Sequence, residues 1–88
     1  MAAEDHTWTI VAADGEGDTV DLREPKDSRL EHLLRQAVHH LVGAHAKVDD
    51  YELLIGGVVQ TNLELTLEAA GLHDRAEVVI MLKDVNRG

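Results

Sequence analysis

The chain has 88 residues and a formal net charge of −9, because it contains eight Lys and Arg and seventeen Asp and Glu residues. This length allows one domain with a modest core, and the lack of cysteine excludes disulfides, thiol nucleophiles and thiolate metal sites. The negative charge repels phosphate backbones, and Trp8 and Tyr51 alone offer large aromatic rings for base stacking. The composition therefore argues against nucleic acid as a partner.

The two ends of the chain differ in character from the segment between them. The first residues are acidic and lack the apolar core of a signal peptide, and the apolar runs are too short to span a bilayer. We therefore expect a cytoplasmic protein without a membrane partner, which also fits the lack of cysteine. We expect a flexible leader over 1–6, one domain over 7–83 and a flexible C-terminal tail over 84–88.

The first two elements form a predicted β-hairpin. The run 7–14 is rich in β-branched and aromatic residues, and the run 18–24 alternates apolar and polar residues, which is typical of strands. Glycines and aspartates over 14–18 predict the turn between them, and Pro25 ends the second strand.

The next segment predicts an amphipathic helix over 28–42. Ser28 and Glu31 have the spacing of a capping box, and Gly43 stands where a C-terminal glycine belongs. Apolar residues recur at the spacing of one helical stripe, at Leu30, Leu33, Leu34, Ala37, Val38, Leu41 and Val42.

The remaining residues predict a second group of strands. In order, they predict a strand at 51–55, a glycine turn at 56–57, a short return strand at 58–60, a short helical turn closed by Gly71 within 65–76, and a last strand at 77–83. The last strand is almost continuously apolar, so we expect it at the centre of the sheet, paired with the first. The predicted fold is α+β: a mixed sheet of four to five strands packed on one helix, the β-grasp arrangement.

With these elements in place, the chain resembles ubiquitin and its relatives over about residues 7 to 88. "YELLIGGVVQ" stands where that family has a strand, a small-residue turn and a return strand. "LTLEAAGLHDRAEVVIMLK" stands where it has a short helix, a hydrophobic anchor (here Leu72), a loop and the final strand, and "DVNRG" matches the tail that ends in glycine. The likeness is greatest to small stand-alone bacterial ubiquitin-like proteins, which are encoded with activating, conjugating and deubiquitinase-like enzymes.

The resemblance implies that this chain modifies other proteins. An activating enzyme would adenylate the Gly88 carboxylate with Mg-ATP, and the chain would pass as a thioester to an amine, usually a lysine, to form an isopeptide bond. Glycine suits this role because it has no side chain, so that an enzyme can close around it. Lys83 and Arg87 would be read during tail recognition. The family most often ends in two glycines, whereas here Asn86 and Arg87 precede a single one.

The alternation of side chains along strands predicts a docking surface on the open face of the sheet. We expect the residues that face the helix to be Leu53, Ile55, Val78, Ile80 and Leu82. Their neighbours Leu54, Val79 and Met81 would then be exposed together. An exposed apolar group of this kind indicates a partner site, and in ubiquitin relatives this face is the usual docking surface.

The other polar groups of the sequence give no chemistry of their own. The histidines of the predicted helix lack the spacing of a zinc site, and the alternating carboxylates at Asp14, Glu16 and Asp18 favour a turn over a calcium loop. No nucleophile lies beside a base, so we expect no enzyme activity, no metal and no cofactor. Possible acceptor lysines, at which chains could form, are Lys26, Lys47 and Lys83.

Two other functions remain open for this fold. The first is a binding module that is never conjugated, such as a secretion-system accessory domain, which would use the Leu54 and Met81 face. The second is a sulfur carrier, which ranks lower because that role normally requires two terminal glycines.

Overall fold

The N-terminal hairpin forms as predicted in the computed structural model, which describes residues 7–83. Strands β1 (Thr7–Ala13) and β2 (Thr19–Pro25) pair antiparallel from Thr7 opposite Pro25 to Ala13 opposite Thr19. The leader and the tail predicted at 1–6 and 84–88 lie outside the described residues.

Helix α1 (Leu30–Leu41) carries the predicted apolar stripe but begins without the predicted capping box. Arg29 is the N-cap residue and no side chain caps the helix, so the capping prediction at Ser28 and Glu31 was wrong. The first free N–H groups are instead satisfied by tertiary contacts, because Leu30 N–H donates to Leu65 O at 2.8 Å and Glu31 N–H donates to Leu63 O at 2.9 Å.

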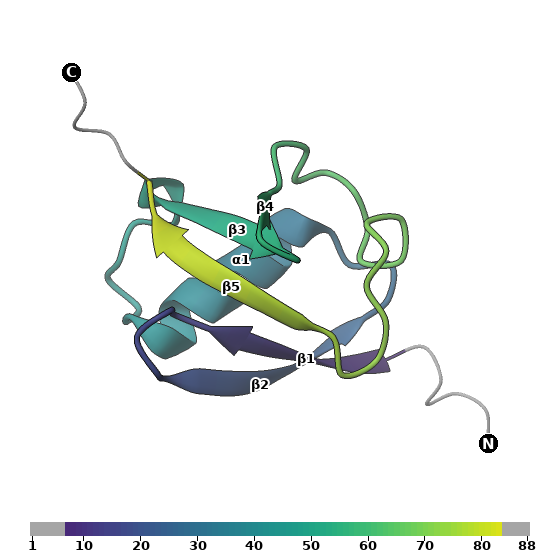
Figure 1. Ribbon diagram of the computed structural model, residues 1–88, viewed down its shortest axis with the longest axis horizontal. Coiled ribbons are helices and arrows are strands. Elements are labelled where there is room, and N and C mark those ends of the chain that lie inside the picture. Colours follow the sequence, from purple (N-terminus) through teal and green to yellow (C-terminus); the bar gives the residue numbers. More distant parts are fainter. Residues whose placement is uncertain (1–6, 84–88) are drawn as a thin grey trace.

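The sheet has five strands in the order β2-β1-β5-β3-β4. Strand β5 (Glu77–Leu82) lies at the centre, parallel to β1 and antiparallel to β3 (Tyr51–Ile55), which pairs in turn with the short β4 (Val58–Val59). Figure 1 shows α1 crossing behind this sheet, so that the opposite face of the sheet is left open. The predicted α+β fold and the central place of the last strand are confirmed.

The segment between β4 and β5 contains the predicted short helical turn, in which Ala70 N–H donates to Thr66 O at 3.0 Å. Thr66 Oγ1 accepts the N–H of Ala69 at 3.0 Å, and Gly71 N–H donates to Glu68 O at 3.1 Å. The chain then turns back, and Leu72 is buried as the predicted hydrophobic anchor. Within 7–83, no helix has the length and apolar character needed to cross a membrane.

The core lies between α1 and the inner face of the sheet. Burial of aliphatic side chains is the main favourable term in such a fold. The largest fully buried side chains come from both layers and from the loop before β5: Ile10, Leu30, Leu33, Leu53, Leu67, Ile80, Val38 and Val78.

One charged side chain is buried at the edge of this core. Glu24 lies on β2 opposite Trp8 and is only 6% exposed. Its Oε1 lies 3.3 Å from Nε2 of His32, on the helix. This contact gives the buried carboxylate a partner and assigns His32 a structural role.

The two-residue turn between β3 and β4 supplies a first testable expectation. Gly56 and Gly57 have φ of 59° and 81°, the left-handed region in which a side chain is strained. A Cβ at Gly56 would meet no atom within 4 Å, so any cost of substitution comes from the backbone alone. We expect Gly56→Ala to lower the free energy of unfolding by about 1 kcal/mol and Gly56→Asn to lower it less, since Asn tolerates this region. Urea unfolding of both variants measures this, and equal losses would contradict the backbone explanation.

Candidate functional site

The outer face of the sheet, which α1 leaves open, presents every second residue of β5 and β3. Val78 and Ile80 are 1% exposed and Leu53 is fully buried, so these three point toward the helix. Leu54 and Val79, which pair with each other across β3 and β5, therefore point outward. The structure brings together the residues that the sequence nominated for this face, while their role in docking stays a prediction.

An apolar row crosses this outer face from one strand to the next. Residues directly opposite each other in neighbouring strands share one face of a sheet. Val79 lies opposite Ala13 on one side and Leu54 on the other, and Leu54 also lies opposite Val59, which is 41% exposed. The apolar row is therefore Ala13, Val79, Leu54 and Val59.

Carboxylates lie on both sides of the apolar row. On one side, Val11 lies opposite both Asp21 and Glu77. On the other side, Glu52 lies opposite Met81, whose side chain is 48% exposed. An apolar centre between acidic positions suits a partner that has apolar anchors and basic flanks. Within the described strands the cationic side chain is Arg23 on the edge strand β2. It lies two residues after Asp21 and on the same outer face.

Leu82 differs from its sequence prediction. We expected it in the core beside Val78 and Ile80, but it is 63% exposed, so that prediction was wrong. Helix α1 ends at Leu41. A cleft lies between the end of the helix and the end of β5, and Leu82 lines this cleft and stays exposed.

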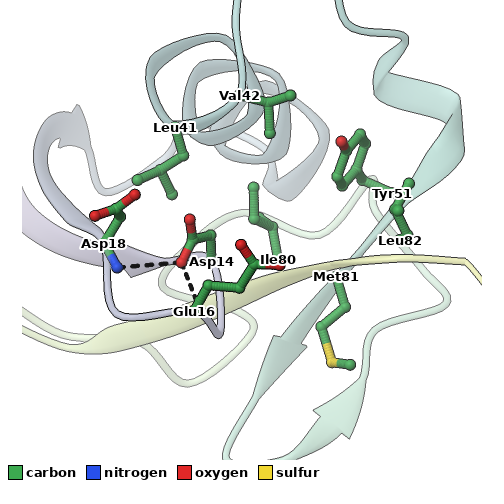
Figure 2. A pocket seen from close by; sticks show the side chains of 9 residues that line it. All are labelled: Asp14, Glu16, Asp18, Leu41, Val42, Tyr51, Ile80, Met81 and Leu82. Carbon is green, nitrogen blue, oxygen red and sulfur yellow. Dashed lines mark hydrogen bonds between the residues drawn. The ribbon is translucent and has the colours of Figure 1, made fainter.

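A cleft opens at this uncovered end of the sheet (Figure 2). It has a volume of about 360 Å³. Figure 2 shows Leu41 and Val42 above it and Tyr51 with Leu82 at one side, while Met81 points to the opposite side of β5 from Ile80. The residues that line it are Asp14, Glu16, Asp18, Leu41, Val42, Tyr51, Ile80, Met81 and Leu82.

The acidic side of the cleft is the β1–β2 turn. Asp14 Oδ1 accepts the backbone N–H of Glu16 at 2.8 Å and that of Asp18 at 3.2 Å, which holds the turn. The turn predicted from these carboxylates is confirmed, and the Asp14 side chain is committed to it. The described residues contain no group of three His, Cys, Asp or Glu side chains that could hold a metal ion.

Three of the residues nominated for conjugation or as acceptors, Lys26, Lys47 and Lys83, lie within the described residues. Lys83, the last described residue, is exposed, and its backbone N–H donates to Asp50 O at 2.8 Å. Nζ of Lys26 lies 3.8 Å from Oε2 of Glu68, with which it forms a salt bridge. Lys47 is exposed. Arg87 and Gly88 lie outside the described residues.

Reasoning from the sequence missed the cleft and two members of the apolar row. Ala13 and Val59 belong to the row only through strand register, which a single sequence does not specify. The exposed Val42 and Leu82 looked like the ends of core stripes. Gly43 was a signal in the sequence, because a glycine that ends the helix at this position limits how much of the last strand the helix can cover.

The comparisons with known proteins agree with this fold. No protein-family model matches the chain, and no curated protein matches it either. Among solved structures, the ubiquitin of Caldiarchaeum subterraneum is 20% identical with a TM-score of 0.71, and the match covers 92% of this chain and 99% of that one.

Two ubiquitin-like domains of other proteins match to a similar degree. The domain of Dsk2 from Plasmodium falciparum is 12% identical with a TM-score of 0.74, and the match covers 88% of this chain and 99% of that one. A domain from Arabidopsis thaliana is 14% identical with a TM-score of 0.73, and the match covers 94% of this chain and 84% of that one. With its five-stranded mixed sheet and single helix, this chain has the ubiquitin-like β-grasp fold.

Proposed function

We propose that this chain is a ubiquitin-like protein modifier, recognised on the outer face of its sheet and joined to a target amine through Gly88. The observation that carries the proposal is the apolar row on a face that α1 does not cover. Its partners would be activating and conjugating enzymes of the ubiquitin type, a deubiquitinase-like protease and the modified proteins. Ubiquitin-like domains are typically non-catalytic, so the chemistry would reside in these enzymes.

The outer face supports docking because its apolar surface has no structural use within the described chain. Aliphatic side chains in the middle of a sheet face normally pack against a second layer or give way to polar residues. Here Leu54 and Val79 contribute to neither core layer, and Val59 and Met81 are about half exposed. Covering these side chains on binding would remove apolar surface from water, which is the main driving force of association.

The same central strand supports a role for the tail. Strand β5 contributes Val79 to the apolar row and continues within four residues to Lys83, whose N–H is held by Asp50 O. An enzyme docked on the row would therefore meet Lys83 at a fixed position.

The decisive experiment is a charging assay. The full chain is incubated with an activating-type enzyme from its own organism and Mg-ATP, and the products are separated with and without reductant. We expect a reducible adduct for the wild-type chain, none for a chain that lacks Gly88, and strongly reduced charging for Gly88→Ala, because a methyl group would enter a narrow active site.

The rival binding module predicts a different result. If the activating-type enzyme charges its own known substrate but forms no adduct with the wild-type chain, conjugation fails and docking without conjugation takes its place. Adducts that form equally well without Gly88 would also overturn the proposal, because the reacting carboxylate would then lie elsewhere. A sulfur carrier would be identified by mass spectrometry. A C-terminal thiocarboxylate, in which sulfur replaces one oxygen, is about 16 Da heavier than the carboxylate.

A further inference from the structure

The cleft at the end of the sheet is built from apolar and anionic side chains. Val42 and Leu82 are 44% and 63% exposed, and both line it although they come from the end of α1 and from β5. Met81 also lines it, but its side chain points to the opposite side of β5 (Figure 2). Large exposed apolar side chains gathered at one place mark an interaction site more often than single ones do.

The opposite rim of the cleft is anionic. Glu16 and Asp18 are both exposed, and neither forms an ion pair with another of the described residues. The residues that line the cleft include three carboxylates and no Lys, Arg or His. The rim therefore holds negative charge that the described part of the protein does not neutralise.

We infer that this cleft is a second docking site, separate from the apolar row, which seats a Lys or Arg side chain of a basic partner segment. The aliphatic stem would lie along Leu41, Val42 and Leu82, and the cationic group would reach Glu16 and Asp18. Long basic side chains combine these two requirements, since they bury their methylene groups while keeping the charge beside carboxylates or water. This inference does not depend on conjugation through Gly88.

Charge complementarity distinguishes this occupant from others. A second copy of the chain carries the same −9 charge, so its surface would be repelled by the acidic rim. An acidic or purely apolar segment would leave Glu16 and Asp18 close to an apolar surface with no counter-charge. A basic segment with apolar neighbours satisfies both walls of the cleft at once.

The test is a titration of the isotope-labelled full chain, followed by NMR, with the peptide acetyl-Gly-Leu-Arg-Arg-Leu-Gly-amide. We expect shifts of the amide signals of Glu16, Val42 and Leu82. The double variant E16Q/D18N should weaken binding about fivefold. Asp14 is left unchanged in this variant because its carboxylate holds the turn.

A matched variant separates the cleft from the general charge of the protein. D27N/E64Q removes the same two charges at exposed positions that do not line the cleft, and we expect less than about a twofold change. Equal losses in both double variants would mean attraction by net charge alone and would overturn the inference. So would shifts confined to Leu54 and Val79, or binding that appears only after removal of 84–88, because the tail would then be the occupant.

Discussion

Replacing Leu53 with alanine is expected to lower the free energy of unfolding by about 3 kcal/mol, whereas the same change at Leu54 should lower it by less than about 1 kcal/mol. The two residues are neighbours on β3 and have the same side chain, but Leu53 is fully buried against the helix layer and Leu54 lies on the outer face. Truncating Leu53 removes buried methyl groups and leaves a cavity, while truncating Leu54 removes surface that is already in contact with water.

Trp8 provides the measurement because it is the single tryptophan and packs against the core. Its fluorescence is followed during urea unfolding of the wild-type chain and of both variants. A loss of about 3 kcal/mol is a large fraction of the stability of a small domain, so Leu53→Ala is measured at reduced temperature. Equal losses at the two positions would mean that something covers the outer face as well, and would contradict the open sheet.

The second large effect concerns function. Leu54→Glu should weaken docking on the outer face at least about thirtyfold, while the unfolding temperature falls by only a few degrees. Leu54 is flanked by Val79 and Val59 in the apolar row, so a carboxylate there would be desolvated by any partner that covers the row. The neighbouring Glu52 and Glu77 add like charge, which increases the penalty.

The measurement is the concentration of this chain that half-saturates charging by its activating-type enzyme. Ala44→Glu serves as the control, because it adds the same charge at an exposed position of the loop after α1. Similar losses for the two variants would show that total charge, and not the row, controls recognition. Unfolding of Leu54→Glu would instead place Leu54 in the core and contradict its outward position.

Much of the fold could be predicted because local patterns and tertiary structure agree in it. The stripe from Leu30 to Val38 specified the buried face of α1, and the apolar run from Val78 to Ile80 specified a strand buried at the centre of the sheet. Both patterns report burial, since the buried side chains in them, such as Leu33, Val78 and Ile80, belong to one core between the two layers.

Features that depend on contacts distant in sequence could not be predicted in the same way. The helix start was assigned to Ser28 because a local cap was available, but carbonyls of Leu63 and Leu65 supply the acceptors. Leu82 continued the alternation of a buried strand, yet its exposure is decided by where α1 ends. In both cases the deciding partner lies roughly thirty residues or more away in the sequence, and no local pattern encodes a contact over that separation.

The candidate site was predictable to the same extent. Alternation nominated Leu54, Val79 and Met81, and the structure places all three away from the helix. The extension of the row to Ala13 required the parallel register of β1 and β5, which is a property of the folded sheet. The anionic cleft required four segments to meet, so no single stretch of sequence indicated it.

The central position of β5 has a consequence for how the protein is made. Its neighbours β1 and β3 leave the ribosome before it does, and until it emerges they have no strand between them. Nascent chains that stop before Glu77 would hold two unpaired strand edges, a state prone to aggregate. Completion of β5 is therefore the step that joins the two halves of the sheet in a newly synthesised molecule.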